Sequence, residues 1–321
     1  MQLVTLERNG RAEAGVVIDG EVLSLAGAAD AVAAARGLPP TLRAIFEAGE
    51  GALDKVRRTA DAARAEAVAA RLRESGALAA RDSVTLLAPV PDTWFILSCG
   101  MNSRAHSREM NSAPPPHPYG FSKSLTAIIG TGASIVLPAS NPGMVDWEGE
   151  FSVVIGRRCH NVSAADAMDY VVGYTLVNDV SARDWVAGVR AKAGIMEPIL
   201  AWDRNILGKQ FPTFCPMGPT VATKDEIADI GGTRVVTRLN GEVMQSATMD
   251  DLVFGVPELI EYYSRFYVFR PGDIITTGSP PGVGHGRKPP VYMRPGDRIE
   301  VSSEAIGTLS NPVVAEAAAR R

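Results

Sequence analysis

Cysteine is scarce in this 321-residue chain, and its pattern excludes two common kinds of stabilising site. The three cysteines, Cys99, Cys159 and Cys215, are odd in number, widely spaced and without a C-x-x-C pair. A disulfide framework needs paired cysteines, and a structural zinc site needs closely spaced ligands. We therefore expect neither site, and we expect all three thiols to be reduced and mostly buried.

Long apolar runs and a strong excess of one charge are missing as well. No uninterrupted apolar run approaches the roughly 20 residues of a membrane-spanning helix, and residues 1–8 lack the charged-then-apolar layout of a signal peptide. The net charge is −4 and the basic residues are scattered, which argues against a surface for nucleic acid or anionic membranes. With 46% hydrophobic residues, we expect a globular, cytoplasmic protein whose ligand is a small molecule.

The first ninety residues contain no histidine, no cluster of carboxylates and no glycine-rich phosphate loop. Turn signals, Asn-Gly at 9–10 and Asp-Gly at 19–20, separate short strand-like runs and predict a small antiparallel meander. From residue 26 to about 81 the sequence is alanine-rich and predicts helices. One narrow apolar face recurs at helical spacing, formed by Leu53, Val56, Ala60, Ala63, Ala67 and Ala70.

Prolines at 89 and 91 separate this region from the rest of the chain. The change of composition there predicts a structural N-terminal domain, 1–90, and a second domain, 91–321, that carries the chemistry.

The most informative stretch is Asp-Trp-Glu-Gly-Glu at 146–150, followed by a strand-like apolar run over 151–155. Side chains alternate along a strand, so Glu148 and Glu150 point the same way. Their repulsion must be relieved by protonation, by basic partners or by a divalent cation, and Mg²⁺ and Ca²⁺ prefer such hard oxygen ligands. The competing interpretation is an edge strand with two exposed acids.

A second strand-like run over 170–177 ends in a polar cluster that contains Asp179. This carboxylate at a strand end could complete an oxygen triad with Glu148 and Glu150. Upstream, the spacing H-x-x-E puts His106 and Glu109 on one face of a helix, where the carboxylate can accept the imidazole N–H and raise its basicity. That pair predicts a general base, and the alternative is a surface histidine beside a surface glutamate.

Four motifs in this order resemble the fumarylacetoacetate hydrolase family. The chain reads G-M-N-S-R-A-H-S-R-E at 100–109, D-W-E-G-E at 146–150, G-Y-T-L-V-N-D-V-S-A-R-D at 173–184 and P-G-D-I-I-T-T-G-S-P-P-G-V-G at 271–284. The resemblance runs from about Pro91 to about Asn311. It implies an α+β, mostly β fold, with a mixed β-sandwich or roll as catalytic domain and a smaller N-terminal α+β domain that contacts the partner of a homodimer.

The resemblance also implies roles for particular residues. The His106–Glu109 pair is the catalytic dyad on a segment that orders over the substrate, and Lys209 neutralises the charge of a developing enolate. The metal is Mg²⁺, with Mn²⁺ or Ca²⁺ as alternatives, held by Glu148, Glu150 and Asp179. The residues that the resemblance assigns to substrate binding are Arg183, Lys123, Gln245, Thr277 and Ser279.

Several of these assignments have a structural alternative. Lys123 could equally be a lysine at a strand edge, and Arg183 could pair with Asp184 or Glu150 for structure alone. Asp146 is expected to orient its neighbours rather than to bind metal.

Three further residues complete the expectations. Trp185 stands where many relatives have glutamine, which predicts a narrower or more apolar pocket. We expect His160 on the surface without a role, and His285 to be a surface histidine near the mouth of the pocket.

Taken together, these implications predict a metal-dependent hydrolase that cleaves a carbon–carbon bond in an acylpyruvate-type 2-oxo acid, such as a fumarylacetoacetate or fumarylpyruvate. The dyad would activate water for attack on the distal carbonyl. The alternatives are a 2-oxo acid decarboxylase, isomerase or hydratase of aromatic or sugar-acid catabolism, and a non-catalytic binding protein that kept the fold.

Overall fold

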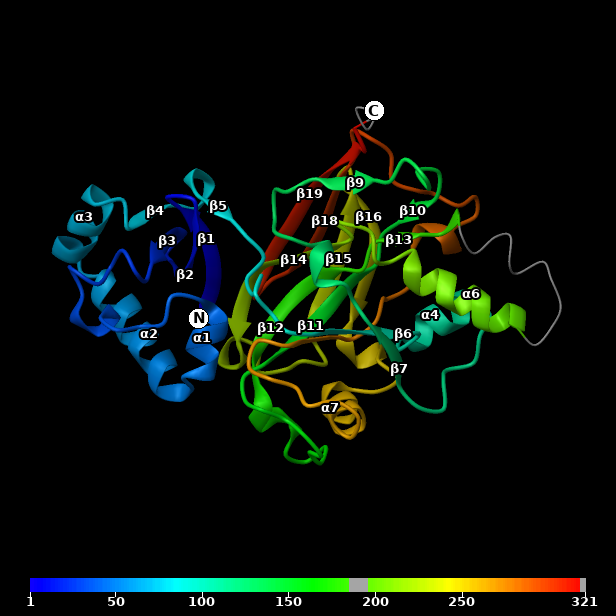
Figure 1. The fold of residues 1–321 in the computed structure, drawn as a ribbon, viewed down its shortest axis with the longest axis horizontal. Helices are drawn as coiled ribbons and strands as arrows, with labels where there is room; N and C mark the ends of the chain where they lie inside the picture. The colour runs from blue at the N-terminus through cyan, green and yellow to red at the C-terminus, as the bar shows by residue number, and fades with distance from the viewer. Residues whose placement is uncertain (185–195, 318–321) are drawn as a thin grey trace.

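The computed structural model describes residues 1–184 and 196–317, and a long twisted sheet dominates it (Figure 1). This sheet has twelve strands, with the order β4-β3-β2-β1-β14-β12-β11-β17-β6-β7, while β5 pairs with β1 and β8 with β14. The strands are β1 (Gln2–Arg8), β2 (Arg11–Ile18), β3 (Glu21–Ser24), β4 (Leu78–Ala80), β5 (Thr85–Leu86), β6 (Ile96–Gly100), β7 (Tyr119–Ser122), β8 (Ile128–Ile129), β11 (Gly149–Ile155), β12 (Val171–Asn178), β14 (Cys215–Thr223) and β17 (Ile274–Thr276).

A five-stranded sheet packs beside it, in the order β16-β15-β18-β19-β9, and a two-stranded sheet pairs β10 with β13. These strands are β9 (Ile135–Leu137), β10 (Val145–Asp146), β13 (Ser181–Ala182), β15 (Arg234–Leu239), β16 (Glu242–Thr248), β18 (Arg298–Ser303) and β19 (Gly307–Ala315). The α-helices are α1 (Leu42–Glu47), α2 (Glu50–Ala63), α3 (Glu66–Glu74), α4 (Arg104–Glu109), α6 (Met196–Leu207) and α7 (Val256–Ser264). The α+β, mostly β architecture predicted from the sequence is confirmed.

The N-terminal meander forms as the turn signals predict. Asn9 and Asp19 have positive φ angles of 53° and 49°, which these residue types and the glycines after them tolerate, and β1, β2 and β3 pair antiparallel around the two turns. Helix α2 buries the predicted apolar face as far as Ala63. The prediction that Ala67 and Ala70 continue this face is wrong, because the helix breaks at residues 64–65 and the new helix α3 has a different phase.

The N-terminal ninety residues share a sheet with the rest of the chain. Strand β1 pairs antiparallel with β14, with Gln2 opposite Ala222 and Leu3 opposite Val221. One hydrophobic cluster accordingly contains Ile45 from the N-terminal part and Met217 from the remainder. The division into domains at residues 90 and 91 stays a prediction, and the structure adds that the sheet is continuous across it.

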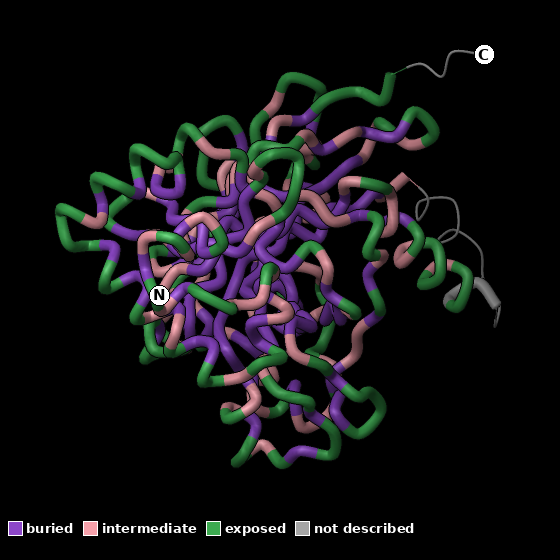
Figure 2. Tube along the Cα trace, turned by 60° about the vertical axis from the view of Figure 1, so that its left-hand side comes forward, coloured by how far each residue is buried: buried purple, intermediate pink, exposed green. Residues whose placement is uncertain are grey.

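The buried core runs through the middle of the molecule, with exposed chain around it (Figure 2). Every residue of the central strand β11 is buried, and its side chains divide by alternation. Phe151, Val153 and Ile155 join one hydrophobic cluster, while Val154 joins another on the opposite face. All three cysteines are free and buried, as predicted. Among the described residues, no helix is both long and apolar enough to cross a lipid bilayer.

Two R-P-G-D turns, at 270–273 and 294–297, form matched sites that differ in burial. In each turn the arginine backbone N–H donates to the aspartate Oδ2, over 2.7 Å at Asp273 and 2.6 Å at Asp297. Asp273 is buried, its Oδ1 has no hydrogen-bond partner among the described residues, and burial raises its pKa to about 6.

A group whose folded pKa is raised stabilises the fold most below its unfolded pKa, here near 3.8, and this contribution is lost as the pH rises through about 6. We therefore expect Asp273→Asn to gain stability relative to the wild type between about pH 4 and about pH 7, by about 1 kcal/mol. Thermal unfolding across this pH range checks it, with Asp297→Asn as the matched control. The prediction would be contradicted if the two variants differed from the wild type in stability by the same amount at every pH.

Candidate active site

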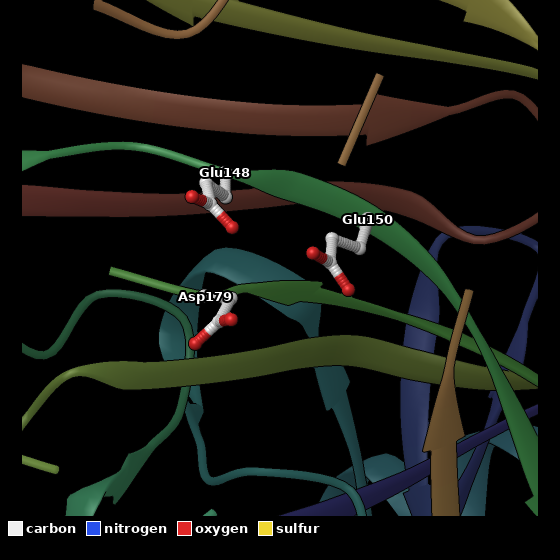
Figure 3. A group of neighbouring side chains, drawn as sticks. All are labelled: Glu148, Glu150 and Asp179. Carbon is white, nitrogen blue, oxygen red and sulfur yellow. The ribbon is translucent and has the colours of Figure 1, made fainter. Parts of the chain in front are cut away.

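Three carboxylates converge at one end of the paired strands β11 and β12 (Figure 3). Gly149 lies opposite Asn178 in this antiparallel pair, so Glu148 and Asp179 extend from adjacent strand ends, and Glu150 projects to the same side as Glu148. One carboxylate oxygen from each of Glu148, Glu150 and Asp179 lies within 4.8 Å of the others. The oxygen triad expected from the sequence is therefore present as a geometric cluster.

Within the described part of the chain, three cations surround these carboxylates. The Lys209 Nζ lies 2.8 Å from Glu148 Oε2 and 2.8 Å from Asp179 Oδ2, and Lys123 pairs with Asp179 Oδ1. Arg183 pairs with Glu148 Oε1. Burial alone raises the pKa of the Glu148 carboxyl, but Lys209 and Arg183 outweigh burial and hold that pKa at about 2. Glu148 is therefore ionised at neutral pH.

Glu150 is the member of the triad whose hydrogen bonds with the described residues are incomplete. Its Oε2 accepts from the Gly278 backbone N–H at 3.2 Å, whereas its buried Oε1 has no hydrogen-bond partner among the described residues. Burial, together with the charges of Asp179 and Glu148, raises the pKa of Glu150 well above its usual value. An unpaired buried oxygen beside two other carboxylates fits a hard divalent cation, which would satisfy that oxygen and relieve the repulsion.

The catalytic pair predicted from H-x-x-E forms on the short helix α4. The Ser103 Oγ caps this helix by accepting from the His106 backbone N–H at 3.0 Å, and His106 Nδ1 lies 2.8 Å from Glu109 Oε2. Glu109 Oε1 accepts from the Gly282 backbone N–H at 3.0 Å. A carboxylate can only accept, so the ring proton lies on Nδ1 and the Nε2 lone pair is available as a base.

A cavity of about 300 Å³ is lined by two carboxylates of the triad, Glu148 and Asp179, and by His106 of the dyad, and its size suits a small ligand. His106, Glu148, Asp179, Arg183, Lys209 and Ser279 all line it. Its remaining lining residues are Cys99, Gly100, Met101, Met110, Tyr119, Phe121, Ala201, Trp202, Asn205, Val283 and His285.

Lys123, Gln245 and Thr277 were predicted to bind substrate, and they do not line this cavity. Gln245 Nε2 donates to Ser279 Oγ at 3.0 Å, and Thr277 Oγ1 donates to the Phe151 backbone oxygen at 2.9 Å. These side chains hold the cavity wall in place, and their direct contact with substrate stays a prediction.

Asp146 orders the polar end of the cavity, as the sequence predicts. Its Oδ2 accepts from Arg183 Nη2 and from the His285 backbone N–H, both at 3.1 Å, and its Oδ1 accepts from the Gly284 backbone N–H at 2.7 Å. The alternative partners considered for Arg183, Asp184 and Glu150, are wrong, because the strand pair β10–β13 brings Asp146 alongside Arg183 instead.

Sequence reasoning missed several residues of the cavity, among them Tyr119, Asn205 and Trp202, because no local motif marks them. Burial and the Glu148 charge raise the pKa of Tyr119 to about 12, so its phenol keeps its proton at neutral pH and can donate a hydrogen bond. His160 is exposed, as expected, and His285 is half-buried and lines the cavity, which agrees with its expected place near the mouth of the pocket. Trp185 lies outside the described residues.

The loop before α7 positions the dyad helix. Asp251 accepts from the Ser103 hydroxyl and, at 3.2 Å, from the Ala105 backbone N–H, so it fixes the N-terminus of α4. We expect Asp251→Ala to lower the turnover number about tenfold and stability by about 1 kcal/mol, because losing such a cap frees the helix that carries His106. Steady-state kinetics and thermal unfolding measure both effects.

The neighbouring Asp250→Ala variant is the control, since Thr248 is the only described residue from which the Asp250 carboxylate accepts a hydrogen bond. If both variants lose turnover and stability to the same extent, Asp251 does not fix the position of α4.

Comparison with known sequences gives a consistent result. The family described as fumarylacetoacetate (FAA) hydrolase C-terminal matches residues 96–314. The mitochondrial oxaloacetate tautomerase FAHD2A of Bos taurus is 43% identical over 277 residues, which cover 86% of this chain and 81% of that protein. The oxaloacetate tautomerase YisK of Bacillus subtilis (strain 168) is 40% identical over 233 residues, 72% of this chain and 73% of that protein.

Solved structures share the fold over nearly the full length. The fumarylacetoacetate hydrolase EaFAH from the psychrophilic Exiguobacterium antarcticum has a TM-score of 0.76 and 31% identity, covering 98% of this chain and 100% of that chain. The maleylpyruvate hydrolase from Sphingobium sp. SYK-6, in complex with manganese(II) ion and pyruvate, has a TM-score of 0.74 and 26% identity, covering 99% and 100%.

Proposed function

Because the chain belongs to the fumarylacetoacetate hydrolase family, we propose that it is a divalent-metal-dependent tautomerase that interconverts the keto and enol forms of a small 2-oxo dicarboxylic acid of the oxaloacetate type. The observation that carries the proposal is the higher identity to relatives named oxaloacetate tautomerase than to the maleylpyruvate hydrolase. His106 lines the same cavity as Glu148 and Asp179, which supports the same chemistry.

The proposed reaction moves one proton from carbon to oxygen. His106 Nε2 takes a proton from the carbon next to the ketone, and the electrons of that C–H bond form the carbon–carbon double bond. The ketone oxygen becomes an enolate, and the imidazolium passes its proton to this oxygen by way of the solvent. Glu109 stabilises the imidazolium that forms. In the reverse direction the imidazolium returns the proton to carbon.

The residues around the enolate oxygen supply positive charge and hydrogen bonds. Lys209 lines the cavity with an ammonium held between Glu148 and Asp179, and Tyr119 contributes a protonated phenol. Such preorganised groups stabilise developing negative charge without reorganisation. A Mg²⁺ ion held by Glu148, Glu150 and Asp179 would supply Lewis-acid polarisation of the substrate oxygens.

Hydrolysis of an acylpyruvate, which the sequence first suggested, is the second candidate. The same dyad can remove a proton from water, and a neighbouring structure is that of a hydrolase in complex with pyruvate. The two reactions differ in product, because hydrolysis releases pyruvate whereas tautomerisation leaves the carbon skeleton whole.

Parallel assays separate the two candidates. The Mg²⁺-loaded protein is given the enol form of oxaloacetate, whose ultraviolet absorbance decays on ketonisation, and a panel of acylpyruvates, from which released pyruvate is measured. We expect acceleration of enol decay and little release of pyruvate. Rapid pyruvate release without acceleration of enol decay would reverse the assignment in favour of the hydrolase.

The identity of the metal, the homodimer and the cellular location remain proposals as well. Mg²⁺ as the metal rests on the oxygen donor set, and the homodimer and the cytoplasmic location rest on the sequence; several relatives are named as mitochondrial proteins. Light scattering during size-exclusion chromatography tests the dimer, because it reports a mass of one or two chains directly.

A further inference from the structure

We propose that Trp202, supported by the ring of Tyr119, forms the end wall of the cavity and limits the chain length of the 2-oxo acids that the enzyme accepts. The class of ligand rests on the proposed function, whereas the position of Trp202 does not. Trp202 lies on α6, and both aromatic residues line the cavity.

Helix α6 leads away from the carboxylate triad. Lys209, two residues after the end of this helix, holds its ammonium between Glu148 and Asp179. Asn205 and Trp202, four and seven residues before Lys209, line the same cavity, as expected for residues on one face of a helix. Because a helix rises by about 1.5 Å per residue, Trp202 lies about 10 Å farther along the helix than Lys209.

Strand β7 faces α6 at two points. The Lys209 Nζ lies 5.6 Å from the centre of the Phe121 ring, and the centres of the Trp202 and Tyr119 rings lie 5.1 Å apart with 73° between their planes. Phe121 and Tyr119 are two residues apart on β7 and therefore share a side of the strand. The edge-to-face contact of Trp202 with Tyr119 thus joins α6 to β7 at the end of the cavity away from Lys209.

Gly100 fixes the place of the Tyr119 ring. It lies opposite Tyr119 in the β6–β7 pair, and a Cβ at this position would lie 2.7 Å from Tyr119 Cε2 and 3.2 Å from the hydroxyl oxygen. The ring therefore lies directly over the Gly100 backbone, and Trp202 packs on a ring that cannot shift towards β6. Trp202 itself is 39% exposed, so truncating its side chain opens the wall to solvent and leaves no buried void.

An aromatic wall at this distance from the triad discriminates by length. When the 2-oxo end of a ligand lies at the triad, each methylene group added to the chain moves the second carboxylate towards the Trp202 ring. A carboxylate pressed against this ring would lose water, and the ring could yield only by breaking its contact with Tyr119.

A series of unreactive 2-hydroxy dicarboxylic acids tests the proposal. Malate has the carbon skeleton of oxaloacetate, and 2-hydroxyglutarate and 2-hydroxyadipate are each longer by one further methylene group. Dissociation constants are measured by titration calorimetry on the Mg²⁺-loaded wild type, Trp202→Ala and Trp202→Phe. Trp94→Ala is the matched control, because Trp94 is an exposed tryptophan that does not line the cavity.

We expect the affinity of the wild type to fall about tenfold or more from malate to 2-hydroxyadipate. Trp202→Ala should bind 2-hydroxyadipate about tenfold or more tightly than the wild type does, and should change malate binding by less than about threefold. Trp202→Phe keeps an aromatic ring against Tyr119 and should keep most of the preference for malate. Trp94→Ala should behave as the wild type, and thermal unfolding shows that the variants fold.

Two results would overturn the proposal: a wild type whose affinity does not fall with chain length, or a Trp202→Ala variant that binds 2-hydroxyadipate no better than the wild type does. Because binding needs no turnover, a length preference that depends on Trp202 would stand even if the tautomerase assignment failed. Conversely, tautomerase activity without this preference would remove only the role of Trp202.

Discussion

Replacing His106 by glutamine is expected to lower the turnover number about 10²- to 10⁴-fold, the range typical for loss of a positioned general base. The amide of glutamine can still form a hydrogen bond, but it cannot take the proton from the substrate carbon. The binding of malate should change little, because the carboxylate triad and Arg183 remain. Steady-state kinetics with the enol form of oxaloacetate and calorimetry with malate give the two readouts.

His160→Gln is the matched control for this variant, since His160 is an exposed histidine that does not line the cavity. A His106→Gln enzyme that retains turnover would exclude the dyad as the base. A variant that loses malate binding to the same extent as turnover would assign His106 to binding rather than to proton transfer.

Replacing Glu150 by glutamine is expected to have opposite effects on metal binding and on the stability of the metal-free protein. Affinity for Mn²⁺ should fall about 100-fold or more, because one of three anionic ligands becomes neutral. The metal-free variant should be more stable than the metal-free wild type by about 1–2 kcal/mol, because a buried carboxylate no longer repels Asp179 and Glu148.

Calorimetric titration with Mn²⁺ measures the affinity, and thermal unfolding in EDTA measures the stability. Glu304→Gln, at an exposed glutamate, is the control for a change of charge alone. Unchanged affinity for Mn²⁺ in the Glu150 variant would show that this carboxylate is not a ligand. If the Glu150→Gln variant is less stable than the wild type in EDTA, the wild-type protein already neutralises the Glu150 carboxylate without metal.

The parts of the site that follow from local periodicity could be predicted from the sequence. Glu148 and Glu150 share a side because a strand alternates, and His106 meets Glu109 because a helix brings residues three apart together. The Asn-Gly and Asp-Gly pairs of the N-terminal meander likewise favour the positive φ angles of their turns, whatever the rest of the fold. In each case the relevant atoms lie within a few residues of one another.

The parts that depend on tertiary arrangement could not be predicted. The pairing of β10 with β13 decides that Arg183 meets Asp146. Tyr119 reaches the cavity from β7 with no motif of its own. The break between α2 and α3 after Ala63 could not be predicted either. No glycine or proline marks this break, and the alanine pattern of the sequence continues through it.

The central claim is that the chain acts on its substrate only with one divalent cation held by Glu148, Glu150 and Asp179. Its most direct test is to strip the wild-type protein with EDTA, return Mn²⁺ in steps, and follow bound Mn²⁺ by electron paramagnetic resonance together with the rate of enol decay. The account predicts no acceleration in the stripped protein and a rate that rises in proportion to bound Mn²⁺ until each chain holds one ion. Full acceleration by protein that holds no bound metal would contradict it.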